Sequence, residues 1–235
     1  TGALLEAMAQ GRSMAIFGAG RTPVSLSGAA AALLWIDEKQ GRLNTTTALF
    51  RKGDRPASEV PVGPALPVAP AAPAVDQSGL GDAEKTLPPA LQRLPEVASC
   101  LEDSVLPDVR DQGSAARLND RTLLWSIPCG AGAYNLTSHW YLTDADGRNP
   151  RPVALVGTGG PGADPVRPDN TTVNGTYDPK TRILSAFAKG RGIGDCGALQ
   201  TWVWTGERFA LSRESVMGEC AGVPADLWPV AWRAR

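Results

Sequence analysis

The chain has 235 residues, of which 43% are hydrophobic and 20% charged, and its formal net charge is -1 at pH 7. This balance is ordinary for a globular protein, and it gives no excess positive charge that would attract nucleic acid or an anionic membrane surface. No apolar run approaches the ~20 residues that a membrane helix needs, so we expect a protein that does not span a membrane.

The first 55 residues predict a small, partial α+β domain. In chain order, the expected elements are a helix at 2–10, strands at 14–18 and 23–26, a helix at about 28–40 and a strand at 45–51. The alanine-rich second helix has strong helix formers, with Ser25 or Ser27 as its expected cap and Gly41 as its stop signal. The threonine-rich run at 45–51 is β-prone.

Residues 56–86 predict a spacer between two domains. Six prolines recur among alanine and valine between Pro56 and Pro73, and no aromatic residue is present. Proline removes backbone donors, and such a composition buries too little apolar surface to fold. We therefore expect a semi-rigid, polyproline-type linker.

Residues 87–235 predict an antiparallel β-sandwich or barrel. Short helical turns interrupted by Pro95 come first, over 87–101. Strands are then expected at 122–127, 133–143, 153–156, 171–177, 182–188, 199–204 and 208–211. Turn signals every 8–12 residues are typical of all-β folds. The loop 157–169 contains a formal GxGxxG pattern, but its prolines exclude the helix that a dinucleotide site needs. No cofactor is expected.

Four cysteines favour disulfides and an oxidising compartment. Cys100, Cys129, Cys196 and Cys220 are widely spaced, so a closely spaced zinc site is not expected, and no other metal site is expected. An even count in a loop-rich chain suits two disulfides, although four reduced core cysteines are the alternative. We favour the pairs Cys100–Cys129 and Cys196–Cys220 because each joins neighbours in sequence, but three pairings are open.

The segment 188–197 is a glycine-rich loop with a cationic rim. Lys189 and Arg191 alternate with glycines, and Asp195 precedes Cys196. Its backbone amides could form an anion-binding nest assisted by both cations. The structural alternative is a bulge loop fixed by Cys196, in which Arg191 pairs with Asp195.

Two tryptophans and one histidine complete the candidate residues. Trp202 and Trp204 share one face of a strand, where they could stack on sugar rings or a partner peptide, or simply form core. His139 is the only histidine, so a two-histidine zinc site within this chain is impossible. A hydrolase or transferase would have to use His139 with a carboxylate.

Several segments resemble the DUF1176 proteins of Gram-negative bacteria: 24–42, 128–135, 189–197 and 216–220. The resemblance implies an exported, periplasmic protein of unestablished function with disulfides among its cysteines. Family members look longer at the N-terminus, with a signal peptide and a further cysteine pair. The resemblance therefore implies a truncated first domain, with 1–55 as its C-terminal part, which is weakly similar to invasion-associated locus B proteins. It supplies no catalytic residues.

Together these features indicate a non-enzymatic cell-envelope protein that binds an envelope protein or glycan. The cationic loop and the tryptophan pair are its expected binding residues. An envelope hydrolase or transferase using His139 is the alternative, and a purely structural envelope component is a third possibility.

Overall fold

The computed structural model describes residues 2–15, 23–80, 86–103, 114–158 and 170–235. The chain divides into two compact units, Thr1–Ala65 and Leu66–Arg235. The second unit is mainly β, with antiparallel sheets and two disulfides, as the sequence predicts. Most of the predicted loop with the GxGxxG pattern, residues 159–169, lies outside the described residues.

The first unit contains both expected helices. Its elements are α1 (Gly2–Gln10), β1 (Ser13–Ala15), β2 (Pro23–Ser25), α2 (Ala29–Lys39) and the short 3-10 helix η1 (Ala57–Glu59). The strands β1 and β2 pair antiparallel. The expected serine cap of α2 is wrong, because Gly28 occupies the N-cap with a φ of +87° and no side chain caps the helix.

The strand expected at 45–51 is also wrong. Turns occupy most of this segment, and one isolated bridge joins Thr45 to Arg55. The carboxylate of Asp37, fully buried on α2, accepts hydrogen bonds from the backbone amides of Leu49 and Phe50 at 2.7 and 3.0 Å. A buried charge that is satisfied in this way outweighs local β-propensity and bends the chain around the helix.

Part of the expected spacer packs on the second unit. The amide of Ala72 donates to the carbonyl of Trp204, and the side-chain amide of Gln77 donates to the carbonyl of Arg117. Leu80 is buried in a hydrophobic cluster. Residues 66–80 are therefore held by contacts with the β-domain, whereas their proline-rich composition alone predicts an independent extended segment.

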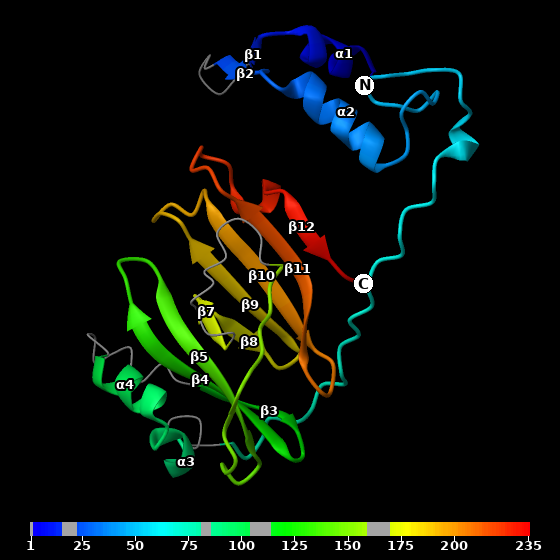
Figure 1. The fold of residues 1–235 in the computed structure, drawn as a ribbon. Helices are drawn as coiled ribbons and strands as arrows, with labels where there is room; N and C mark the ends of the chain where they lie inside the picture. The colour runs from blue at the N-terminus through cyan, green and yellow to red at the C-terminus, as the bar shows by residue number, and fades with distance from the viewer. Residues whose placement is uncertain (1, 16–22, 81–85, 104–113, 159–169) are drawn as a thin grey trace. The chain divides into compact units, whose positions relative to one another are not determined.

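The second unit is a β-sandwich with a helical layer on one side (Figure 1). One sheet has the order β3-β4-β5-β6, with β7 also paired to β5, and the other has the order β12-β11-β10-β9-β8. In chain order the elements are α3 (Pro89–Gln92), α4 (Pro95–Asp103), β3 (Ser114–Asn119), β4 (Thr122–Ala131), β5 (Leu136–Asp144), β6 (Arg151–Pro152), β7 (Thr171–Val173), β8 (Thr176–Asp178), β9 (Ile183–Lys189), β10 (Gly197–Trp204), β11 (Phe209–Met217), η3 (Ala225–Leu227) and β12 (Val230–Arg233).

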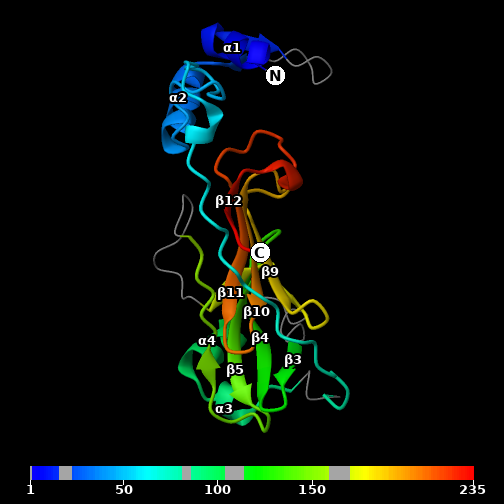
Figure 2. The ribbon, with the colours of Figure 1, turned by 90° about the vertical axis from the view of Figure 1, so that its right-hand side faces the viewer.

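The two sheets enclose one hydrophobic core, and in the turned view of Figure 2 the strands β10 and β11 overlap β4 and β5. From β4 and β5 come Leu124, Trp140 and Leu142, and from β9 and β10 come Leu184 and Trp202. Alternating side chains on β4 and β5 point to the opposite face, where they meet α3 and α4 in a second cluster. The first sheet is thus buried on both faces.

The strand boundaries show where local pattern fails. The structure adds β3, β6 and β12, which were not predicted as strands, and it leaves 153–156 without strand pairing although Val153 and Leu155 are buried. The strand expected at 171–177 is two short strands, because Asn174 adopts a φ of +49° between them. Each correction depends on contacts between segments distant in sequence.

Candidate functional site

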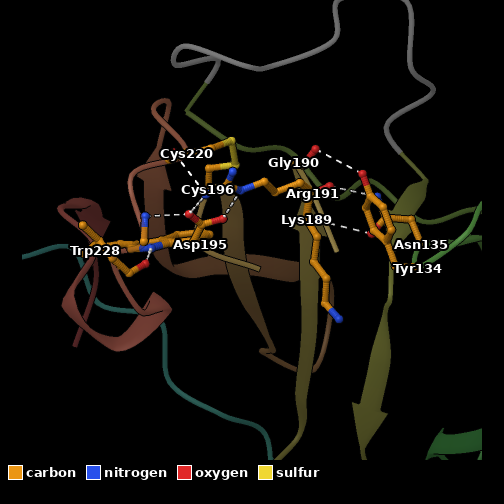
Figure 3. Close-up of a disulfide and its surroundings, with 11 residues drawn as sticks. Tyr134, Asn135, Lys189, Gly190, Arg191, Asp195, Cys196, Cys220 and Trp228 are labelled. Atoms are coloured by element: carbon orange, nitrogen blue, oxygen red, sulfur yellow. Dashed lines mark hydrogen bonds and ion pairs between the residues drawn. A yellow bond between two sulfur atoms is a disulfide. The ribbon is translucent and has the colours of Figure 1, made fainter. Parts of the chain in front are cut away.

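The loop between β9 and β10 has a fixed shape (Figure 3). The Cys196–Cys220 disulfide joins its C-terminal end to the segment after β11, which confirms one favoured pair. The amide of Gly190 donates to the carbonyl of Cys196 at 2.8 Å. Gly197 has a φ of +130°, and a Cβ there would lie 1.9 Å from the carbonyl oxygen of Ala188, so only glycine fits.

Arg191 and Asp195 form a structural pair inside this loop. The Nε of Arg191 donates to Oδ1 of Asp195 at 2.7 Å, and the amide of Gly222 donates to Oδ2 at 2.6 Å. Asp195 is only 4% exposed. The guanidinium, followed by the Gly222 amide, lowers the pKa of Asp195 to about 2. The arginine that was expected to attract an anion is thus neutralised within the loop.

Lys189 lies at the base of the same loop but takes no part in this pair. Figure 3 shows its side chain extending away from Arg191, and its Nζ lies 5.6 Å from the centre of the Phe187 ring. The neighbouring β4–β5 hairpin fixes the backbone here, because the side-chain Nδ2 of Asn135 donates to the Lys189 carbonyl at 2.9 Å and the hydroxyl of Tyr134 donates to the carbonyl of Gly190. These hydrogen bonds fix the loop, and Lys189 is its one cation outside the Arg191–Asp195 pair. Anion binding at this loop stays a prediction.

The prediction that Trp202 and Trp204 form an exposed binding surface is wrong. Trp202 and Trp204 are each 2% exposed and belong to the core between the two sheets. Their face of β10 is the inner one, where they pack with Leu184 and Phe209. Of the two interpretations of this pair, the core is what the structure contains, and neither indole can stack on a ligand.

An apolar groove that sequence reasoning missed lies in the second unit. Its volume is about 700 Å³, and we call it the Trp232 groove. Its lining is mostly aliphatic and aromatic: Pro67, Val68, Ala69, Ala154, Val156, Gly157, Thr158, Arg208, Phe209, Ala210, Leu211, Ala231, Trp232 and Ala234. Trp232 is 38% exposed and Val156 is 59% exposed. The signal in the sequence is weak, because the groove joins four separate segments of the chain, at 67–69, 154–158, 208–211 and 231–234.

Hydrogen bonds between side chains and the backbone fix parts of the lining of the Trp232 groove. The indole Nε1 of Trp232 donates to the carbonyl of Leu211 at 3.2 Å, which fixes the ring on β12. On the opposite wall, the carbonyl of Val156 accepts a hydrogen bond from Trp202, and the amide of Thr158 donates to Glu214. The walls are therefore fixed to the second sheet even though much of the lining is exposed.

A second, smaller pocket contains His139. Its volume is about 390 Å³, and Glu96, Tyr141 and Asn170 line it together with Pro152, Val153 and Ala154. The structure thus brings the single histidine and a carboxylate to one pocket, as the enzymatic alternative requires. The Cys100–Cys129 disulfide, the other favoured pair, lies beside it and joins α4 to β4. The Sγ of Cys100 lies 3.6 Å from Nδ1 of His139.

The pocket shifts the protonation of two of its groups. Burial lowers the pKa of His139, and the charge of Glu96 opposes this change. Burial also raises the pKa of the Tyr141 phenol, which interacts with Asn170 and Glu96. Near neutral pH the pocket therefore contains an uncharged imidazole, an uncharged phenol and one carboxylate.

No described helix has both the length and the apolar character to cross a membrane. No solved structure matches the chain significantly. An uncharacterised protein of Escherichia coli (strain K12), YpfG, is 33% identical over 236 residues, which cover 99% of this chain and 66% of the relative. The family model for proteins of unknown function DUF1176 matches residues 1–235. The chain therefore belongs to the DUF1176 family.

Proposed function

We propose that this chain is an exported, non-enzymatic binding protein and that the Trp232 groove is its ligand site. The ligand is an amphiphile with one acyl chain and an anionic head group. The observation that carries this proposal is an apolar groove of about 700 Å³ with a single arginine, Arg208, among its lining residues.

The size and lining of the groove support a small-molecule ligand. Ligand sites in proteins usually measure roughly 300–1,000 Å³ and are lined mostly by apolar side chains with a few polar groups. The Trp232 groove matches this description, with Trp232, Leu211 and Val156 as apolar walls. Covering these exposed side chains with an acyl chain would remove apolar surface from water, which favours binding.

The charge of the groove supports an anionic head group. Among its described lining residues Arg208 is the only charged side chain, and none is acidic. A guanidinium binds carboxylate or phosphate oxygens through paired N–H donors. An amphiphile can therefore place its chain on the apolar walls and its head group at Arg208.

Two observations support export. Both disulfides join cysteines of the second unit, and disulfides persist mainly in oxidising compartments. The second is the resemblance of the sequence to DUF1176 proteins, which carries the expectation of a periplasmic location. An exported protein of the cell envelope would meet lipids and their fatty acids as ligands.

Calorimetric titration with dodecanoate tests the proposal. We expect saturable binding to the wild-type chain, weaker by more than tenfold in Arg208→Gln, because a hydrogen bond to a charged group contributes ~1.5–3 kcal/mol. Trp232→Ala should also weaken binding. The uncharged dodecanol should bind wild type and Arg208→Gln equally.

Two exposed residues outside the groove provide matched controls. Arg213 is exposed on β11, and Trp35 is exposed on α2. Arg213→Gln and Trp35→Ala should leave dodecanoate affinity unchanged. The proposal fails if dodecanoate does not bind, or if Arg208→Gln and Trp232→Ala both bind it like the wild type.

A further inference from the structure

The most reactive set of side chains in the second unit lies beside the His139 pocket. The Sγ atoms of Cys100 and Cys129 and a ring nitrogen of His139 all lie within 4.8 Å of one another. Cys100 is buried on α4, whereas Cys129 and His139 are half-buried. In the oxidised chain the two sulfurs are bonded to each other, so only the imidazole offers a free donor.

The spacing of sulfur and nitrogen matches a tetrahedral metal site. Zinc binds thiolate at ~2.3 Å and imidazole nitrogen at ~2.0–2.1 Å, which separates two such ligands by about 3.6 Å at the tetrahedral angle. The Sγ of Cys100 and Nδ1 of His139 are 3.6 Å apart. Reduction would free both sulfurs as ligands while α4 and β4 keep them near the histidine.

The surrounding charge also favours a cation. Among the described residues that line the His139 pocket, Glu96 is the only one with a charged side chain, so the pocket offers a cation a carboxylate and no competing positive side chain. Zinc accepts carboxylate oxygen or water in addition to sulfur and nitrogen.

The residues around the Cys196–Cys220 disulfide form a less suitable metal site. Asp195, Cys196 and Cys220 also place three potential ligand atoms within 4.8 Å of one another. There, however, the carboxylate is paired with the guanidinium of Arg191 and with the amide of Gly222. A metal ion that binds Asp195 would have to displace the Arg191 guanidinium and break the hydrogen bonds from Arg191 and Gly222. This cluster therefore serves as an internal control.

We propose that Cys100, Cys129 and His139 form a redox-controlled site for a thiophilic divalent cation such as zinc. A dithiol reduces the Cys100–Cys129 bond: two electrons and two protons pass to the two sulfurs, and the dithiol is oxidised to its own disulfide. The cation then displaces one proton from each thiol and binds both thiolates and Nδ1 of His139. A disulfide oxidant restores the Cys100–Cys129 bond: it takes two electrons from the two thiolates, picks up two protons to become a dithiol, and the cation is released.

Cobalt(II) titration of the reduced, full-length chain under anaerobic conditions tests this proposal. Thiolate-to-cobalt charge-transfer absorption and visible bands of tetrahedral cobalt should appear at one equivalent, and zinc should abolish them. The oxidised chain should give neither signal. The double variant Cys196→Ser/Cys220→Ser should bind one equivalent like the wild type.

The histidine variant separates a metal ligand from a folding role. His139→Gln keeps both disulfides, so near-UV circular dichroism of its oxidised form checks the fold. We expect its reduced form to bind cobalt at least ~10-fold more weakly, since even the loss of an outer-shell partner costs that much. Unchanged affinity in His139→Gln, loss of the signal in Cys196→Ser/Cys220→Ser, or a reduced chain that gives no thiolate–cobalt absorption would each overturn the proposal.

Discussion

Two tryptophans on one strand should respond differently to the same substitution. Trp202 and Trp204 lie two residues apart on β10, are equally buried and share one core. The indole Nε1 of Trp202 donates to the carbonyl of Val156 at 3.0 Å, whereas Nε1 of Trp204 is buried without a hydrogen-bond partner among the described residues. Trp202→Phe removes a satisfied donor, and Trp204→Phe removes an unsatisfied one.

The difference between the two variants isolates the hydrogen-bonding contribution. Both substitutions delete a similar volume from one core, so the transfer and cavity costs largely cancel in the comparison. A satisfied hydrogen bond contributes about 1 kcal/mol net, and a buried unpaired donor costs ~1–3 kcal/mol. Trp202→Phe should therefore be less stable than Trp204→Phe by about 2 kcal/mol or more.

Thermal and denaturant unfolding followed by circular dichroism measure this difference. For a unit of this size, about 2 kcal/mol corresponds to a gap of roughly 4–8 °C between the two melting temperatures. Trp202→Phe should also weaken dodecanoate binding, because the Val156 carbonyl belongs to a wall of the Trp232 groove. Equal melting temperatures would refute the reasoning, as would a lower one for Trp204→Phe.

Two further predictions concern the β9–β10 loop. The pKa of Asp195 is lowered to about 2, so its pairing with Arg191 stabilises the fold above the ordinary pKa of 3.8, and this stabilisation is lost as the pH falls toward 2. The difference in melting temperature between wild type and Asp195→Asn should therefore shrink between pH 5 and pH 2. A constant difference would contradict the pairing. Gly197→Ala should strongly destabilise the second unit, because of its φ of +130° and the close Ala188 carbonyl. Gly218→Ala is the matched control, since no atom lies within 4 Å of its added Cβ, and similar melting temperatures for these two variants would contradict this account.

The sequence predicted what depends on local pattern. Period-two alternation identified most strands of the sandwich, helical spacing identified α1, and a run of strong helix formers identified α2. The favoured disulfide pairs are confirmed, because each closes a short segment of chain between neighbouring cysteines. Pairing of Arg191 with Asp195 was likewise foreseeable, since four residues separate them around a tight turn.

What the sequence did not predict depends on contacts between distant segments. The run at 45–51 is β-prone, but the buried carboxylate of Asp37 orders it as turns. The sequence around Trp232 gave no indication of a binding site. Only the pairing of its strand, β12, with β11 places Trp232 in a groove with Val156 and Val68. Periodicity carries no information about which segments meet in this way.

The covalent and hydrophobic restraints of the second unit leave one region less constrained. The Cys100–Cys129 disulfide joins α4 to the first sheet, and the Cys196–Cys220 disulfide joins the segments that precede β10 and follow β11 at one end of the second sheet, so neither crosses between the sheets. Packing of the shared core is therefore what holds the sheets against each other. Beside that core, at the strand β12 edge, the aromatic side chain of Trp232 and the segment carrying Val156 stay partly exposed. A ligand that fills the Trp232 groove would supply the contacts that no disulfide provides there, so binding and stability of the sandwich should be linked.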